Sequence, residues 1–225
     1  MTQTAQSTDK YAATRFNMIE QQIRTWEVLD PVVLDLFNAV PRENFVAESQ
    51  VGLAFADVEL PIGHGQTMLS PKIEGRILQA LNIKKTDKVL LVGTGSGYLT
   101  ALLATLAAEV HSVEINPELS ALANARLQKQ HINNVTLYVG DAVNGFEAAA
   151  PYDVIVFAGS LLLRPLAAEK MLNVGGRMFA VIGDQPIMQA TLTQRVAEDA
   201  FRHETVFETC LPPLVNAPQT SKFQF

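Results

Sequence analysis

The sequence has almost no cysteine, no long apolar run and no cluster of basic residues. Its single cysteine, Cys210, excludes a disulfide within the chain, so a reducing cytoplasm is the expected location. Cys210 lies in an apolar stretch, where a place in the core is expected rather than a role as nucleophile. The most apolar segment, residues 98–110, is too short to span a bilayer. The first 22 residues lack the apolar block of a signal peptide, and we expect no membrane partner.

The sequence also lacks the clusters of Lys and Arg that bind nucleic acids. The formal net charge is −6 at pH 7 and no run of five Lys and Arg residues occurs, whereas binding to a phosphate backbone calls for a basic patch. His111, His131 and His203 lack the spacing of metal ligands. We therefore expect neither a nucleic-acid partner nor a metal. The composition, with 48% hydrophobic residues among 225, suits one domain with a substantial core, and it gives no indication of an oligomeric state.

The second part of the chain alternates strand-like and helical segments. Short apolar runs predict five strands, at residues 88–93, 109–114, 135–140, 152–159 and 176–183. Helical periodicity lies between them, at residues 97–108, 116–130 and 165–172. Runs that are apolar throughout suit parallel strands covered on both faces. We predict a doubly wound α/β sheet with five parallel strands within residues 87–183, and an antiparallel hairpin over 187–210 that brings the sheet to seven strands.

The first part of the chain is predicted to be mostly helical. Asp30-Pro31 and Ser70-Pro71 each place a capping side chain before a proline at the first helical position. We expect residues 13–82 to lie near the carboxyl edge of the sheet. The N-terminal region, residues 1–82, is assigned to the same domain as the core over residues 83–225.

The tail from Leu211 has three prolines and little regular pattern. Two interpretations stay open: an extended segment packed by Leu214, Phe223 and Phe225, or a frayed terminus.

A glycine-rich turn joins the first predicted core strand to the next helix. Glycines let the backbone turn tightly and let a ligand approach the helix N-terminus. A dinucleotide fingerprint would need glycine at position 98, which is Tyr98. The spacing G-x-G-x-G is instead the variant found in S-adenosylmethionine (SAM) methyltransferases, although such turns also occur for packing alone. The predicted cofactor loop is Gly93, Thr94, Gly95, Ser96 and Gly97.

Two acidic residues support a SAM site at the carboxyl edge of the sheet. Glu114 closes the second predicted core strand, where a carboxylate can accept hydrogen bonds from both ribose hydroxyls. Asp141, followed by Ala142, comes after the third strand and is placed to receive an adenine amino group. Each acid alone could be a solvated strand end or an ordinary turn residue. The two acids and the loop, in this order, predict SAM as the cofactor.

With these motifs in place, the chain resembles the protein-L-isoaspartate O-methyltransferases. The resemblance runs from about residue 15 to residue 183 and includes VPRENFV, LPIGHGQT, VGTGSGYLTALLA, SVEINPEL, VGDA, APYDVIVFAG and NVGGRMFAVIG. That family uses SAM to methylate the carboxylate of isoaspartyl residues in damaged proteins. The resemblance implies a Rossmann-like seven-stranded fold and damaged protein or peptide substrates.

The resemblance also implies that residues 63–71 form the active-site loop. Gln66 and Thr67 are then expected at the cofactor, and His64 and Leu69 at the substrate; His64 could equally be a structural turn residue. An isoaspartyl carboxylate is already ionised at neutral pH, with an unperturbed pKa of about 3.9. No general base is needed, and most of the catalysis comes from aligning an oxygen with the methyl group.

The chain departs from the family at two positions near the expected chemistry. Leu69 stands where the family has its active-site serine, which leaves Thr67 and Ser70 as candidate hydroxyls, with Ser70 also expected as a helix cap. Leu91 replaces an acid that helps to hold the cofactor's ammonium group, a loss of about 1.5–3 kcal/mol. We expect weak SAM binding and slow isoaspartyl methylation, both improved by Leu69→Ser with Leu91→Glu.

The departures keep two further hypotheses open. The chain could be a relative that binds SAM but methylates another acceptor, as Leu69 suggests. It could also be a non-catalytic interaction protein on the same scaffold, as Leu69 and Leu91 together suggest.

Overall fold

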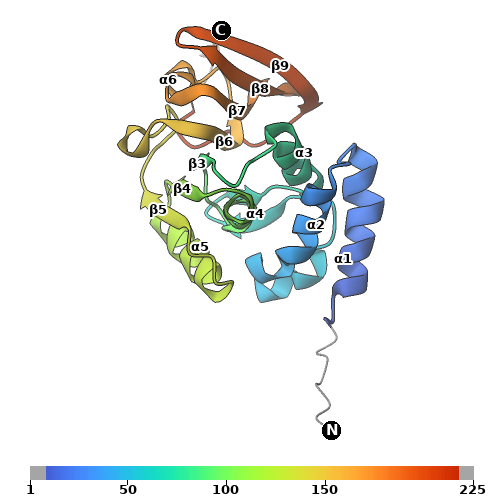
Figure 1. Ribbon diagram of the computed structural model, residues 1–225. Helices are drawn as coiled ribbons and strands as arrows, with labels where there is room; N and C mark the ends of the chain where they lie inside the picture. Colours follow the sequence, from blue (N-terminus) through green and yellow to red (C-terminus); the bar gives the residue numbers. More distant parts are fainter. Residues whose placement is uncertain (1–8, 218–225) are drawn as a thin grey trace, which may run out of the picture.

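A seven-stranded sheet forms the centre of the computed structural model, which describes residues 9–217 (Figure 1). The strand order is β5-β4-β3-β6-β7-β8-β9. The strands are β3 (Lys88–Val92), β4 (Glu109–Glu114), β5 (Val135–Val139), β6 (Tyr152–Leu161), β7 (Leu172–Asp184), β8 (Ile187–Ala197) and β9 (Ala200–Thr209). Phe223 and Phe225, expected to pack the tail, lie outside the described residues.

The pairing confirms the predicted topology. Strands β3 to β7 pair in parallel, with Val89 opposite both Val110 and Val154. β8 and β9 extend the sheet as an antiparallel hairpin. β7 begins earlier than predicted, because Leu172 pairs with Tyr152 and is wholly buried in the sheet. The preceding helix, α6 (Leu166–Lys170), is correspondingly short.

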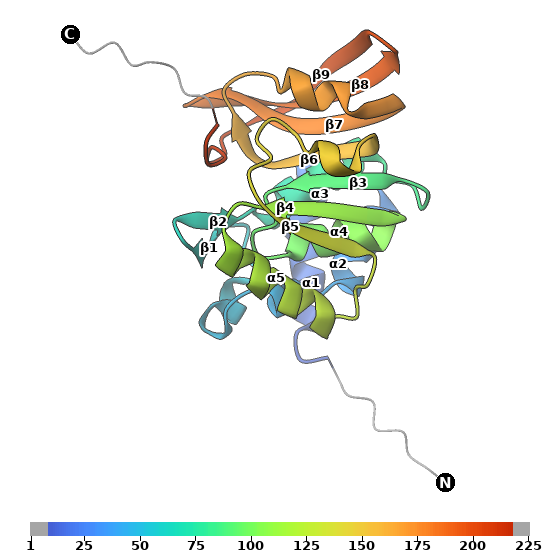
Figure 2. The same ribbon diagram turned by 90° about the vertical axis from the view of Figure 1, so that its left-hand side faces the viewer.

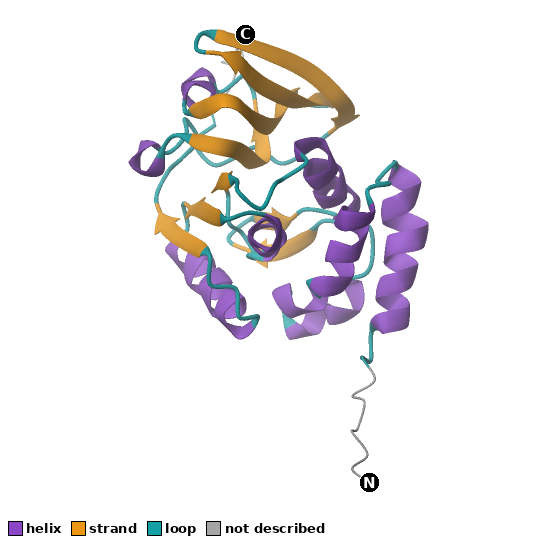
Figure 3. Cartoon of the chain, viewed as in Figure 1, coloured by secondary structure: helices purple, strands orange, loops and turns teal. Residues whose placement is uncertain are grey.

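Both faces of the sheet are covered, but unequally (Figure 3). Val89 and Leu91 of β3 belong to one buried cluster, whereas Leu90 and Val92 belong to a second one. Beyond the strands, the first cluster includes buried side chains from five α-helices, whereas the second includes Ala168 of α6, two residues after β5 and one residue of the tail. The five helices are α1 (Ala12–Met18), α2 (Pro31–Ala39), α3 (Pro71–Leu81), α4 (Tyr98–Leu106) and α5 (Pro117–Lys129).

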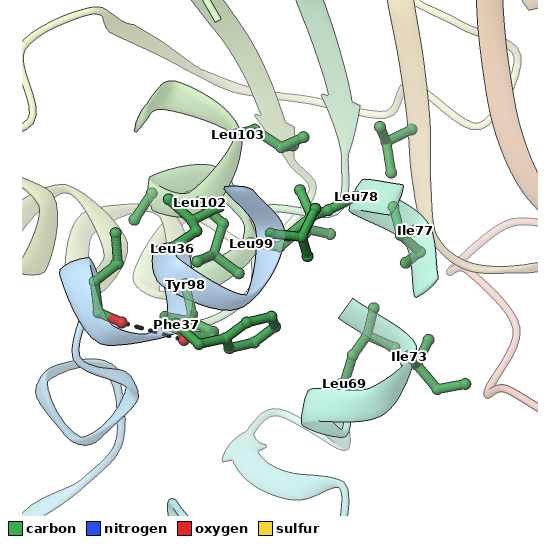
Figure 4. Close-up of a cluster of buried hydrophobic side chains, with 14 of the residues drawn as sticks. Leu36, Phe37, Leu69, Ile73, Ile77, Leu78, Tyr98, Leu99, Leu102 and Leu103 are labelled. Atoms are coloured by element: carbon green, nitrogen blue, oxygen red, sulfur yellow. Dashed lines mark hydrogen bonds between the residues drawn. The ribbon is translucent and has the colours of Figure 1, made fainter. Parts of the chain in front are cut away.

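The N-terminal helices lie on a face of the sheet, which differs from the expected position at its carboxyl edge. α1 continues into a π-helical turn, Ile19–Ile23, and a 3-10 turn, Arg24–Trp26. Further 3-10 turns follow α2 at Arg42–Phe45 and Glu48–Leu53. The reason is apolar burial: α2, α3 and α4 contribute Phe37, Ile77 and Leu102 to a single buried core (Figure 4).

A β-hairpin interrupts this helical region, and only this part reaches the carboxyl edge. β1 (Leu60–Gly63) and β2 (Gln66–Met68) pair antiparallel. The turn between them has positive φ at His64 and Gly65, 53° and 70°, a conformation typical of tight hairpins. The prediction of a mostly helical region missed these strands because they are short. Figure 2 shows the hairpin apart from the main sheet and next to the start of α5.

Cys210 is exposed, so the expectation of a core position was wrong. It directly follows β9, the edge strand of the sheet, where no further strand covers the chain. No helix in the described part of the chain is long and apolar enough to cross a membrane.

Candidate functional site

A cleft opens at the carboxyl ends of the parallel strands. This is the usual position of a ligand site in open α/β sheets. Its walls come from four places: the hairpin with Leu69, the end of β3 with the glycine loop, the region around the carboxyl ends of β4, β5 and β6, and the tail. The residues used below that line it are Ile62, Gln66, Thr67, Leu69, Val92, Gly93, Gly95, Glu114, Asp141, Ala142, Gly159 and Leu214.

The glycine loop gives the cleft space rather than hydrogen-bond donors. Gly93, Gly95 and Gly97 have φ values of 95°, 54° and 86°, a region that favours glycine. Their N–H groups donate within the protein, to Val113 O at 2.9 Å, Glu114 Oε2 at 2.8 Å and Thr94 O at 3.0 Å respectively. These donors are therefore not available to a pyrophosphate, which agrees with the absence of a dinucleotide fingerprint.

Three of the predicted cofactor residues shape the loop and do not line the cleft. Thr94 Oγ1 lies 2.7 Å from Ser112 Oγ, and Ser96 Oγ accepts a 3.2 Å hydrogen bond from the Tyr98 N–H. Both side chains are buried. Gly97 is turned against α5, where an added Cβ would come within 3.1 Å of Ala123 Cβ. Of the five loop residues predicted to contact the cofactor, Gly93 and Gly95 are the two at the cleft wall.

Glu114 is the carboxylate at the centre of the cleft floor, with a relative exposure of 4%. Its Oε2 accepts from the Gly95 N–H, and its Oε1 accepts from the Asn116 N–H at 3.0 Å. Each carboxylate oxygen has a second lone pair. Glu114 can therefore hold the glycine loop in place and still accept hydrogen bonds from two neighbouring hydroxyls, as a ribose presents them.

Asp141 and Ala142 lie next to Glu114 along the same edge of the sheet. Asp141 Oδ1 accepts from the Val143 N–H at 3.0 Å, and Asp141 Oδ2 accepts from Asn216 Nδ2 at 2.8 Å. Asn216 was not predicted from the sequence, because a residue far along an irregular tail gives no signal of its contact with a strand end.

The tail from Leu211 to Ala217 packs against the end of β6. This part of the tail is therefore the expected packed segment and not a frayed terminus. Ser160 at the end of β6 donates its N–H to Pro212 O and its hydroxyl to Leu211 O, both at 2.9 Å. The Leu214 N–H in turn donates a 3.0 Å hydrogen bond to Ser160 O. Leu214 covers Gly159, where a Cβ would lie 3.0 Å from the leucine side chain. The Pro212-Pro213 pair, which favours extended backbone, was the signal that could have revealed this wall.

The hairpin forms the opposite wall. Gln66, Thr67 and Leu69 line the cleft, and Leu69 is only 6% exposed. The Thr67 hydroxyl donates to Glu59 Oε2 at 3.1 Å. Ile62 Cδ1 would lie 3.2 Å from a Cβ at Gly95, so the hairpin touches the glycine loop.

His64 and Ser70 lie outside the cleft lining. His64 Nε2 is 3.2 Å from Glu118 Oε2 on the first turn of α5. Ser70 occupies the N-cap of α3, and its carbonyl accepts the N–H groups of Ile73 and Glu74. Its hydroxyl makes no capping hydrogen bond, so the expected side-chain cap is absent. Of the two candidate hydroxyls, the structure places Thr67 at the cleft.

Leu91 does not face the cleft. Its exposure is 0%, and it packs in the helix-covered cluster, whereas its neighbour Val92 lines the cleft. Successive residues of a strand point to opposite faces, which explains the difference.

A buried ion pair lies behind Leu69. Arg42 and Glu74 are 0% and 1% exposed and pair directly. Burial raises the pKa of Glu74, whereas the neighbouring Arg42 lowers it and favours the charged carboxylate. Arg42 Nη2 also donates to Leu69 O at 2.6 Å, and its guanidinium lies 5.2 Å from the ring centre of Tyr98.

The donor set fits SAM and offers no metal site. The part of the chain that the structure describes holds no group of three His, Cys, Asp or Glu side chains suited to a metal ion. Two carboxylates at one end of the cleft suit a ribose and an adenine amino group. The glycine loop leaves room beside them, and the remaining lining is largely apolar.

The chain is similar to known proteins over most of its length. The model of the family described as protein-L-isoaspartate(D-aspartate) O-methyltransferase (PCMT) matches residues 13–219. The match therefore extends beyond residues 15–183, which carry the motifs, and into the tail as far as residue 219. The protein-L-isoaspartate O-methyltransferase of Protochlamydia amoebophila (strain UWE25) is 41% identical over 201 residues, covering 88% of this chain and 95% of the relative. That of Koribacter versatilis (strain Ellin345) is 38% identical over 205 residues, with 91% and 92% covered.

Among solved structures, a putative protein-L-isoaspartate O-methyltransferase from Plasmodium falciparum, in complex with S-adenosyl-L-homocysteine, has the same fold. Its TM-score is 0.76 at 18% identity, over 88% of this chain and 96% of that one. The two sequence matches span most of this chain and nearly the full length of both relatives. The chain belongs to the protein-L-isoaspartate(D-aspartate) O-methyltransferase family.

Proposed function

We propose that this protein transfers the methyl group of SAM to the carboxylate of isoaspartyl residues in damaged proteins and peptides. The observation that carries the proposal is the cleft lined by Glu114 and the glycine loop together with Thr67 of the hairpin and Leu69, which follows the hairpin. The family membership of the chain supports the same reaction.

In this proposal the cofactor lies along the carboxyl edge of the sheet. Glu114 accepts hydrogen bonds from the ribose hydroxyls, and Asp141 with Ala142 holds the adenine. The backbone at Gly93 and Gly95 lies against the methionine part. Gln66 and Thr67 then face the reacting end of the cofactor from the hairpin.

The reaction needs little from titratable side chains. SAM supplies an electrophilic methyl group: an acceptor carboxylate oxygen forms the new O–CH₃ bond while the S–CH₃ bond breaks, giving a methyl ester and S-adenosylhomocysteine without net proton transfer. The protein aligns the two atoms and excludes water. Ile62 and Leu69 provide apolar walls, and Thr67 is the hydroxyl proposed to contact the acceptor.

A second candidate function is methylation of another acceptor. Two features favour it: Leu69 provides no hydroxyl, and the Thr67 hydroxyl already donates to Glu59. A non-catalytic role stays as the third hypothesis. No nucleic-acid or membrane partner is part of the proposal, and a cytoplasmic location remains a proposal.

The deciding experiment combines calorimetry with a methylation assay. We expect SAM and S-adenosylhomocysteine to bind, and an isoaspartyl peptide to accept a methyl group while the aspartyl peptide of the same sequence does not. Binding without methylation would support another acceptor. The absence of binding, in a folded protein, would contradict both enzymatic hypotheses.

A further inference from the structure

Arg42 joins three segments that meet behind the wall of the cleft. It lies in the 3-10 turn Arg42–Phe45 and is wholly buried. One end of its guanidinium pairs with Glu74 of α3, and the other donates to the Leu69 carbonyl at 2.6 Å. Its guanidinium carbon lies 5.2 Å from the ring centre of Tyr98, the first residue after the glycine loop. We refer to Arg42, Glu74, the Leu69 carbonyl and Tyr98 as the Arg42 cluster.

The hydrogen bond to Leu69 matters because of where this residue lies. Leu69 connects the hairpin to α3, and its side chain lines the cleft where the proposed methyl transfer takes place. Ser70, the next residue, provides no side-chain cap to fix the start of α3. The backbone at this junction is therefore held from behind by Arg42.

The shape of the guanidinium suits this role. Arginine presents donors in a rigid planar fork, whereas the lysine ammonium is a single point on a flexible stem. One fork can bond the Glu74 carboxylate and the Leu69 carbonyl together and still lie next to the Tyr98 ring. A buried ion pair is a poor source of stability, since its desolvation cost offsets much of the attraction. We therefore attribute its presence to its geometry.

We propose that Arg42 is a positioning residue for the reaction: it fixes the Leu69 backbone relative to the glycine loop and thereby sets the acceptor-side wall of the cleft. The inference rests on the proposed function for its effect on turnover. Its structural part, the restraint on residues 66–70, does not depend on that function.

The chain contains a matched control at the other end of the strands. Arg177 donates to Asp87 Oδ2 at 2.6 Å and to the carbonyls of Leu81 and Asn82 at 2.6 and 2.8 Å. This Arg177 cluster has the same chemistry, a mostly buried arginine between a carboxylate and backbone carbonyls. Asp87 directly precedes β3, whereas the cleft lies at the carboxyl end of that strand.

The test compares Arg42→Lys and the double variant Arg42→Met with Glu74→Leu against Arg177→Lys. The double variant replaces the buried pair by apolar side chains, a change that proteins often tolerate. Three quantities are measured on the full chain: amide hydrogen exchange of residues 66–70, the Kd of S-adenosylhomocysteine, and kcat and KM for an isoaspartyl peptide.

We expect both Arg42 variants to exchange the amides of residues 66–70 roughly tenfold faster and to lose roughly tenfold in kcat, the effect of one lost hydrogen bond to a charged group. The Kd should change less than threefold, because Glu114 lies elsewhere in the cleft. Arg177→Lys should lower stability while exchange at 66–70 and kcat stay within twofold of the wild type.

Unchanged exchange and kcat in a folded Arg42 variant would overturn the proposal. So would an equal loss of kcat in Arg177→Lys, because a general loss of stability would then explain the effect. Failure of both Arg42 variants to fold would assign Arg42 to the core and overturn it as well. If the wild type does not methylate the isoaspartyl peptide, the proposed function fails, while the exchange data still decide on Arg42.

Discussion

The two ends of the cleft are built in opposite ways. At the end that we propose for adenosine (the adenosine end), made by Glu114, Asp141 and Ala142, carboxylates face the cleft and backbone N–H groups hold them in place. At the end that we propose for methyl transfer (the transfer end), made by Ile62, Thr67 and Leu69, the wall is mostly apolar, and the ionic groups lie behind it in the Arg42 cluster. Under the proposed function, ligand recognition uses direct contacts, whereas the transfer end is positioned from the protein interior.

The largest expected effect is that of Leu91→Glu, which places a charge on the face of β3 that the helices cover. Leu91→Glu was expected to restore an acid to the transfer end, but Leu91 is wholly buried in the helix-covered core. Because an unpaired buried carboxylate is costly, we expect the free energy of unfolding to fall by about 3–5 kcal/mol. Chemical denaturation measures it, with Leu91→Met as the control of similar volume. A stable Leu91→Glu that binds SAM more tightly would show that this side chain reaches the cleft.

The adenosine end is tested by removing its central carboxylate. Glu114→Ala should weaken SAM binding by about 1.5–3 kcal/mol, since hydrogen bonds to a charged group are lost. Calorimetry measures the Kd, and Glu109→Ala, at the exposed start of the same strand, is the matched control. An unchanged Kd in folded Glu114→Ala would place the ribose elsewhere.

The transfer end is tested by restoring a hydroxyl. Leu69→Ser should raise kcat for an isoaspartyl peptide by up to about tenfold, which is the effect of one new hydrogen bond. Because Leu69 is nearly buried, the variant should also be less stable, so activity is best compared well below its Tm. Leu69→Ala is the control for the loss of volume. Equal activity of the serine and alanine variants would contradict a role for the hydroxyl.

The smallest expected effect concerns the tail. Asn216→Ala removes the amide that donates to Asp141, and we expect SAM affinity to fall by about 0.5–1 kcal/mol because Asp141 loses one fixed partner. The Kd from calorimetry is the readout, with Asn134→Ala as a control at the other end of the strands. A loss as large as that of Glu114→Ala would mean that Asn216 contacts the cofactor itself.

Much of the sheet could be predicted because its signals are local. The apolar runs around Val89, Val110 and Val154 are short and bounded by turns, so the parallel strands and their order along the chain followed from pattern alone. Glu114 and Asp141 could be assigned to the cleft edge for the same reason, since strand ends in a parallel sheet share one side.

The features that could not be predicted from the sequence depend on long-range contacts, which leave no local sequence pattern. The hairpin strands β1 and β2 are stabilised by their neighbours rather than by propensity. The contact of Asn216 with Asp141 and the bond of Arg42 to the Leu69 carbonyl each join distant segments. Leu91 was expected near the cofactor by analogy with a family position, whereas the alternation along β3 points it to the other face.

The position of the tail in the sequence determines when the cleft can form during synthesis. The walls of the cleft begin at Ile62 and are completed by Pro212, Pro213, Leu214 and Val215, which follow all seven strands of the main sheet in the sequence. A nascent chain emerges from its N-terminus, so these strands leave the ribosome while one wall is still missing. Ligand binding at the complete cleft, and any stabilisation that it gives the fold, can therefore begin only after residues 212–215 have emerged.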